Sequence, residues 1–204
     1  TIIGQIYDRI DYPGFSEMKR YGDGSWAPAL RYHDGKFWMF VCMPNDGLFM
    51  STATNPAGPW SPLHCVKSAG GWEDPCPFWD EDGQAYMYWG NPNCYYVKLN
   101  EDMISYSGDI VKLKETPEHY QEGPWFYKRN GHYYLAFAST CCPEGIGYAM
   151  SDSPTGPWKT KGYIMRPTER TRGNHPGIMD YKGKSYVFGL NYDLLKLETN
   201  THYE

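Results

Sequence analysis

Apolar and polar residues alternate over short runs along the chain, and the runs end at glycine, proline or aspartate. The clearest case is EDPCPFWDEDGQAYMYWG at residues 73–90, where an apolar run enters an Asp-Glu-Asp-Gly turn and continues with Tyr86 and Tyr88 on alternate positions. Alternation with period two, interrupted by turn residues, predicts two strands joined as a β-hairpin. The same segment places a carboxylate, Asp74, at the head of its first strand.

This hairpin pattern repeats at regular distances, which indicates a fold built from similar units. The other copies are WAPALRYHDGKFWMFVC from Trp26, EGPWFYKRNGHYYLAFAS from Glu122 and NHPGIMDYKGKSYVFG from Asn174. Their turn glycines are 48, 48 and 52 residues apart (Gly35, Gly83, Gly131 and Gly183). A second marker, Gly-Pro-Trp, recurs in STATNPAGPWSP and AMSDSPTGPWKTK.

A period near 48 residues with about four short strands per unit is typical of a β-propeller blade. In the first whole unit we expect strands at roughly 26–32, 36–43, 47–53 and 63–66. A β-sandwich with similar hairpins is the alternative, but sandwiches do not repeat a four-strand unit in sequence. The pattern therefore predicts an all-β fold of the propeller type.

One polar or aromatic residue stands nine positions before each turn glycine. These residues are Trp26, Asp74, Glu122 and Asn174, and His175 follows the last of them. In a propeller the first strand of each blade lines the central channel, so equivalent positions lie at one level around the axis. We therefore expect these side chains to converge on one axial pocket. Taken alone, an acid such as Asp74 or Glu122 is more often a solvated turn residue, and the shared position in the repeat reverses that preference.

Composition and charge narrow the function further. The chain has 17% aromatic residues, 22 glycines and 16 prolines, which favour an all-β fold over a helical one. A net charge of −5 and the lack of a Lys/Arg run argue against nucleic-acid binding, and no apolar stretch is long enough to span a membrane. The six cysteines form no CxxC motif, so most are expected to be small buried residues, with one disulfide left open.

In these segments the chain resembles glycoside hydrolase family 43, the five-bladed propeller enzymes that act on xylan and arabinan. The matching segments are GSWAPALRYHDGKFWMF, EDPCPFWDEDGQAYM, QEGPWFYKRNGHYYLAF and GNHPGIMDYKGKSYVF. The resemblance implies one propeller domain over 1–204. Its expected blades are a remnant of the first over 1–25, then 26–73, 74–121 and 122–173, and the start of the last over 174–204.

The resemblance also implies roles for particular residues. Glu122 of EGP would be the general acid, and Asp74 of DP the carboxylate that raises the pKa of the acid and orients it. Trp26 would form a wall of the sugar pocket, and His175 would be the axial histidine near a water-bound cation, often calcium. Asn174 is expected beside it among the substrate-binding residues.

Physical chemistry supports this assignment. An inverting glycosidase needs a protonated carboxyl group beside the leaving oxygen and an ionised one that activates water, roughly 6.5–9.5 Å apart. A glutamate stays protonated near neutral pH only when burial or a neighbouring negative charge raises its pKa. Trp72 and Trp125 are candidates for stacking on sugar rings, with inter-blade packing as the alternative for both. Calcium prefers oxygen ligands, so a cation beside His175 would be held mainly by waters, and no HExxH or Cys-His cluster indicates zinc.

The predicted function is an inverting β-xylosidase or α-L-arabinofuranosidase acting on xylo- or arabino-oligosaccharides. No cofactor is expected apart from such a calcium ion. The compartment stays open, with a periplasmic or secreted location favoured. Alternatives are a carbohydrate-binding propeller, a related enzyme acting on fructosides or mannosides, and a protein-interaction propeller of the kelch type. Kelch repeats carry paired glycines, which these units lack.

A general base is harder to find in the sequence. The family's base is an Asp heading the innermost strand of the first blade, and one period before Trp26 lies before Thr1. Asp8, Asp11 and Asp23 are near in sequence, but none occupies the repeated position. We therefore expect an internal fragment of a propeller that lacks its general base and, by itself, hydrolyses no pentosides.

Overall fold

The computed structural model describes residues 2–7, 24–68, 70–90, 93–113, 122–138, 145–166 and 174–190. Its regular elements are fourteen β-strands, so the prediction of an all-β fold is confirmed. The chain divides into two compact units, one of Thr1–Gly90 with Tyr95–Val111 and one of Asn91–Cys94 with Lys112–Glu204. In the described part of the chain, no helix has the length and hydropathy needed to cross a membrane.

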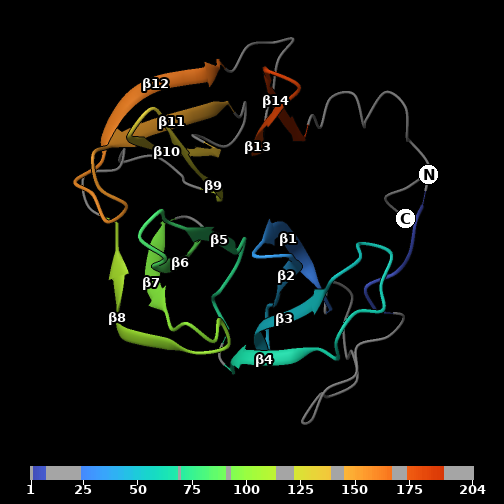
Figure 1. Cartoon of the computed structure of the whole chain (residues 1–204). Helices are drawn as coiled ribbons and strands as arrows, with labels where there is room; N and C mark the ends of the chain where they lie inside the picture. The colour runs from blue at the N-terminus through green and yellow to red at the C-terminus, as the bar shows by residue number, and fades with distance from the viewer. Residues whose placement is uncertain are drawn as a thin grey trace, which may run out of the picture. The chain divides into compact units, whose positions relative to one another are not determined.

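The first unit contains two antiparallel sheets in which each strand pairs with the next along the chain (Figure 1). One consists of β1 (Trp26–His33), β2 (Lys36–Met43), β3 (Gly47–Ala53) and β4 (His64–Lys67). The other consists of β5 (Cys76–Trp79), β6 (Ala85–Trp89), β7 (Tyr95–Leu99) and β8 (Tyr106–Lys112). The strands expected at 26–32, 36–43, 47–53 and 63–66 are confirmed to within one residue.

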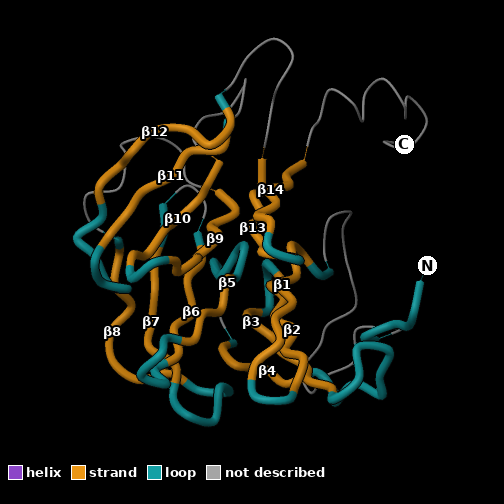
Figure 2. The backbone as a smooth tube through the Cα atoms, turned by 45° about the horizontal axis from the view of Figure 1, so that its top comes forward, coloured by secondary structure: helices purple, strands orange, loops and turns teal. Residues whose placement is uncertain are grey.

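The second unit repeats this plan. Its four-stranded sheet consists of β9 (Glu122–Arg129), β10 (His132–Ala138), β11 (Ile146–Ser151) and β12 (Lys159–Met165). A two-stranded sheet of β13 (Asn174–Tyr181) and β14 (Lys184–Leu190) lies beside it, with β13 next to β9 (Figure 2). The first strands of these two sheets are therefore neighbours, as the first strands of adjacent blades should be.

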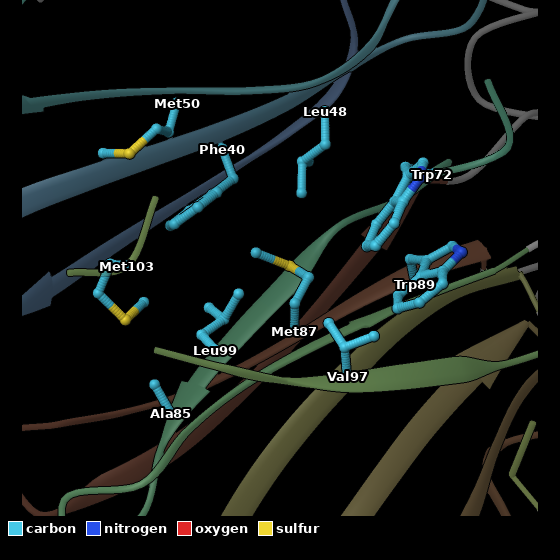
Figure 3. Close-up of a cluster of buried hydrophobic side chains, with 10 residues drawn as sticks. All are labelled: Phe40, Leu48, Met50, Trp72, Ala85, Met87, Trp89, Val97, Leu99 and Met103. Atoms are coloured by element: carbon cyan, nitrogen blue, oxygen red, sulfur yellow. The ribbon is translucent and has the colours of Figure 1, made fainter. Parts of the chain in front are cut away.

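Middle strands are apolar on both faces because both faces are covered. Phe40 of β2 points into a cluster with residues of the β5–β8 sheet, whereas Met39, Val41 and Met43 point to the other face and pack with Phe49. This explains the unbroken run MFVCM, since successive side chains of a strand alternate between faces. The cluster around Phe40 comprises Phe40, Leu48, Met50, Trp72, Ala85, Met87, Trp89, Val97, Leu99 and Met103 (Figure 3).

Three of the four described sheets begin with a one-residue β-bulge, and before β5 the hydrogen bond from the Gly90 N–H to the Glu73 carbonyl gives the fourth sheet the same offset. In the first sheet Trp26 pairs with Cys42 but Ala29 pairs with Phe40, so three steps on β1 face two on β2. The same shift follows Glu122 on β9 and Asn174 on β13. An extra residue of this kind bends the strand and redirects its side chains.

The second residue of each of these strand starts has a positive φ and precedes a proline. The four residues are Ala27 (φ 40°), Asp74 (57°), Gly123 (59°) and His175 (46°). Non-glycine residues rarely adopt this left-handed backbone conformation. These residues align three equivalent positions at the start of each sheet. In chain order the aligned motifs are Trp-Ala-Pro, Glu-Asp-Pro, Glu-Gly-Pro and Asn-His-Pro.

This alignment corrects the expectation that Asp74 is equivalent to Trp26, Glu122 and Asn174. The residue equivalent to Trp26, Glu122 and Asn174 is Glu73, whose carbonyl accepts a 2.9 Å hydrogen bond from the Gly90 N–H. Counting nine residues back from Gly83 was wrong by one because the turn between β5 and β6 is longer by one residue. There the Asp80 N–H bonds to the Gln84 carbonyl and encloses three residues, whereas two-residue turns join the first strands of the other sheets.

Candidate active site

Glu122 occupies the first position of β9, where the bulge begins. Its side chain is 20% exposed, and its Oε1 lies 3.2 Å from Nε2 of His175 at the start of β13. The two residues are 53 positions apart in sequence and meet because β9 and β13 are neighbours. The contact joins a carboxyl group and an imidazole within hydrogen-bonding distance.

His175 is held in place by its own backbone. Its N–H donates a 2.7 Å hydrogen bond to Oδ1 of Asn174, and its φ is +46°. Asn174 is 1% exposed, and its carbonyl lies so close to Gly189 that a Cβ there would be 2.9 Å away. Asn174 thus acts as a buried anchor for His175, and its side-chain oxygen is committed to the backbone.

Gly123 permits the approach of the two strands. A Cβ at this position would lie 2.9 Å from both Cα and Cγ of His175, closer than real Cβ contacts occur. Its φ of +59° is also in the region that glycine adopts without strain. The glycine of the EGP motif is therefore required so that His175 can lie against the backbone beside Glu122.

This arrangement can orient and exchange a proton. An imidazole within 3.2 Å restricts the rotamers of the Glu122 carboxyl group and can donate to it or accept from it according to tautomer and charge. The same contact engages His175 Nε2, and Ca²⁺ takes roughly six to eight oxygen ligands. His175 therefore fits the role of a positioning group better than that of a direct calcium ligand, and a water-bound cation stays a prediction.

Asp74 lies in the first unit, at the positive-φ position of the bulge before Pro75. The negative charge of Asp74 contributes to the raised pKa of the Cys42 thiol. Burial raises the Cys42 pKa to about 12, and the charges of Glu73 and Asp74 add to the effect of burial, while a hydrogen bond from the Trp72 backbone opposes it. Two carboxylates thus stand together at the start of β5, beside a thiol that stays neutral.

The three tryptophans predicted as possible sugar contacts differ in their surroundings. Trp26 is 43% exposed at the start of β1, as a pocket wall requires. Trp72 is 3% exposed and stacks on Trp89 with ring centroids 4.0 Å apart, inside the cluster of Figure 3. This placement favours the packing alternative for Trp72. Trp125 also has a packing partner, since it contacts Phe188 edge-on at 6.4 Å.

The structure brings Glu122, Asn174 and His175 together in the second unit, and it describes Trp26, Trp72 and Asp74 in the first. That Asp74 and Glu122 share one pocket stays a prediction. Asp8, Asp11 and Asp23 lie outside the described residues, as do Cys141 and Cys142.

Sequence reasoning missed Glu73 and the need for Gly123. The proline that ends each bulge would have identified both. A proline lies two positions after Glu73, as it does after Trp26. A proline lies one position after Gly123, as it does after His175.

Comparisons with known proteins agree with this geometry. The model of the glycosyl hydrolases family 43 matches residues 10–202. A protein of Xylanibacter ruminicola named "Putative beta-xylosidase" is 46% identical over 194 residues, which are 87% of this chain and 35% of that protein. A β-D-galactofuranosidase of Aspergillus niger is 37% identical over 69% of this chain and 44% of its own. This chain thus spans less than half the length of these two relatives.

Among solved structures, an α-L-arabinofuranosidase from Clostridium thermocellum is similar with a TM-score of 0.71 and 31% identity. The similarity covers 85% of this chain and 63% of that one. The fold is that of a five-bladed β-propeller, of which the described sheets supply three four-stranded blades and two strands of another. Fold, motifs and family match agree, and the chain belongs to glycosyl hydrolase family 43.

Proposed function

We propose that this chain carries part of the catalytic site of an inverting glycosidase that acts on pentose-containing oligosaccharides. The observation that carries the proposal is the Glu122–His175 contact at the starts of neighbouring first strands, in a member of family 43. A glycosidase needs a carboxyl group held in a defined orientation beside the leaving oxygen. Glu122 is partly buried, held by the imidazole and still 20% exposed to a ligand.

In this proposal Glu122 protonates the leaving oxygen and His175 fixes the direction of the Glu122 carboxyl group. Asp74 supplies the negative charge that keeps Glu122 protonated near neutral pH. An ionised carboxylate on the opposite face of the sugar activates water. The first strands of the other described sheets start with Trp26-Ala27 and Asn174-His175, so neither position supplies that carboxylate.

The names of relatives guide the choice of substrate. Similar proteins are named for β-xylosidase, arabinofuranosidase and galactofuranosidase activities. Xylosides and arabinofuranosides are therefore the first substrates to test, and a β-galactofuranoside is the third. Trp26, exposed at the start of β1, is proposed as the aromatic wall that contacts the sugar ring.

The test is a hydrolysis assay with nitrophenyl β-xyloside, α-L-arabinofuranoside and β-galactofuranoside, on the longest protein that carries these residues. Release of nitrophenol from at least one pentoside, with the opposite anomer appearing first in NMR spectra of the product, is the expected result. Retention of the anomeric configuration would contradict the inverting mechanism. Binding of oligosaccharides without any hydrolysis would instead support the carbohydrate-binding alternative.

A further inference from the structure

A pocket of about 620 Å³ lies in the first unit, at the end of the strands opposite to the bulges. It is lined by the β1–β2 turn, the β5–β6 turn and the turn that follows β7. His33 lies seven positions after Trp26 on β1, so the pocket is roughly 23 Å from the bulge end at about 3.3 Å per residue. It is therefore separate from Trp26 and Asp74, the predicted site residues at the bulge end of this unit.

One wall of the pocket is made of three rings. His33 stacks on Trp79 with centroids 4.5 Å apart and planes 15° apart, and Trp38 lies against Trp79 at 5.9 Å. The Trp38 Nε1–H donates to the His33 carbonyl at 3.1 Å, which fixes Trp38 and leaves its indole N–H satisfied. The rings thus form a rigid aromatic surface at the rim of the core.

Beside Gly83, Ala85, Leu99 and Met103, the remaining lining is polar or negatively charged. Asp34, Asp82 and Glu101 are exposed carboxylates from three different turns. The Gln84 Nε2 donates to the Ala85 carbonyl at 2.8 Å and to the Leu99 carbonyl at 3.0 Å. Both amide hydrogens of Gln84 are therefore used, and the group left for a ligand is its side-chain carbonyl oxygen, which can only accept.

These features select a class of ligand. Three carboxylates would repel nucleic acids and acidic sugars. Among the described residues, the pocket carboxylates do not form a group of donor atoms close enough to hold a metal ion. A ligand with many hydroxyl groups and apolar ring faces matches both halves of the lining, since hydroxyls donate to carboxylate and amide oxygens while ring faces pack on aromatic surfaces. The volume is also within the range of pockets that hold small ligands.

We propose that this pocket is a second carbohydrate-binding site, which holds a neutral segment of the polysaccharide away from the catalytic site. The identity of the sugar rests on the proposed function, whereas the existence of the site rests on the pocket. Binding at such a distance would raise the local concentration of substrate and would matter for polymers but not for short glycosides.

The test compares two glutamates in exposed turns. Glu101→Gln removes a charge that lines the pocket, and Glu81→Gln makes the same change in the β5–β6 turn, at a residue that does not line it. His33→Ala removes one ring of the wall. Each variant is made in the longest protein that carries this chain, and its migration is followed in native gels cast with xylan or arabinan.

We expect Glu101→Gln and His33→Ala to weaken retardation by the polysaccharide at least fivefold, while Glu81→Gln behaves as the unaltered protein. Hydrolysis of nitrophenyl glycosides should be equal in all variants. Equal retardation of Glu101→Gln, His33→Ala and Glu81→Gln, or no retardation of any form, would overturn the proposal. Pocket-dependent retardation in a protein that hydrolyses no glycoside would leave the second site standing and refute the proposed function.

Discussion

At the scale of single residues, the site depends on positions that most side chains avoid. His175 has a left-handed backbone next to a buried Asn174, and Gly123 leaves room for its ring. Such conformations cost about 1–3 kcal/mol each and persist only where the surroundings enforce them. The contact between Glu122 and His175 is thus supported by the backbone as well as by side-chain packing.

Replacing Glu122 by Gln tests its role as general acid. We expect turnover of oligosaccharides to fall by about 100- to 10,000-fold, because their alkoxide leaving groups need a proton. Nitrophenyl glycosides need less assistance and should be affected much less. Equal losses in kcat for both substrate types would contradict the assignment.

The pH dependence distinguishes the two carboxylates at the start of β5. In the proposed mechanism, Asp74→Asn removes the negative charge that disfavours ionisation of Glu122, so the acid would lose its proton at lower pH. The alkaline limb of the pH–rate profile should therefore move to lower pH. Glu73→Gln, one residue earlier, is the control and should leave this limb in place. A shift in Glu73→Gln alone would assign the role to Glu73.

Two tryptophan substitutions separate packing from sugar contact. Trp72→Phe should lower the free energy of unfolding by about 1–2 kcal/mol, because the ring is buried against Trp89, and KM should stay the same. Trp26→Phe should change stability little and raise KM. Urea unfolding and steady-state kinetics on both variants measure the difference. A raised KM in Trp72→Phe at unchanged stability would restore the role of Trp72 at the sugar.

At the scale of elements, the strands and their turns could be predicted from the sequence, whereas the spacing of turn glycines alone did not locate the bulges. Alternating runs between turn glycines define β1 to β4 to within one residue, because side-chain periodicity and turn chemistry are local. The extra residue in the Glu81–Asp82–Gly83 turn adds one to the number of residues between the turn glycine and the start of the sheet. Spacing alone does not show on which side of a turn an insertion lies. Glu122 and His175 meet through a contact between β9 and β13, strands of two different sheets, across 53 residues of sequence.

The β9–β10 hairpin offers a matched pair of glycine substitutions. Gly123 and Gly131 both have positive φ, but a Cβ meets His175 only at Gly123 and meets nothing within 4 Å at Gly131. Gly131→Ala should cost about 1–2 kcal/mol for backbone conformation, and Gly123→Ala roughly 2–4 kcal/mol because of the added overlap. Urea unfolding measures both. Equal losses would show that His175 moves aside without cost.

At the scale of the whole molecule, the sheets repeat one plan with different degrees of covering. Every residue of β6, a middle strand of a four-stranded sheet, is buried, whereas every residue of β14 is exposed. Tyr186, Val187 and Phe188 expose 45%, 41% and 52% of their surface. An exposed apolar strand is a site for pairing with another chain.

This exposure predicts self-association of the chain through β14. Val187→Lys should reduce light scattering at high concentration, because a charged residue on an exposed strand disfavours pairing. Thr160→Lys on β12, a strand that already carries Lys159 and Lys161, is the control and should change scattering little. Unchanged scattering in Val187→Lys would show that association occurs elsewhere.

The bulge also has a consequence for how such proteins diversify. Its second position demands a left-handed backbone, which asparagine, aspartate and histidine tolerate several-fold better than other side-chain-bearing residues. Valine, isoleucine and threonine are strongly disfavoured there. Random mutation at this position is therefore filtered by backbone geometry toward glycine, carboxylates, amides and imidazoles, before any selection for activity. A library restricted to Gly, Asn, Asp and His at positions 27, 74 and 175, with Gly123 kept because a Cβ there would overlap His175, would sample acid–base chemistry around the strand starts while most of its members still fold.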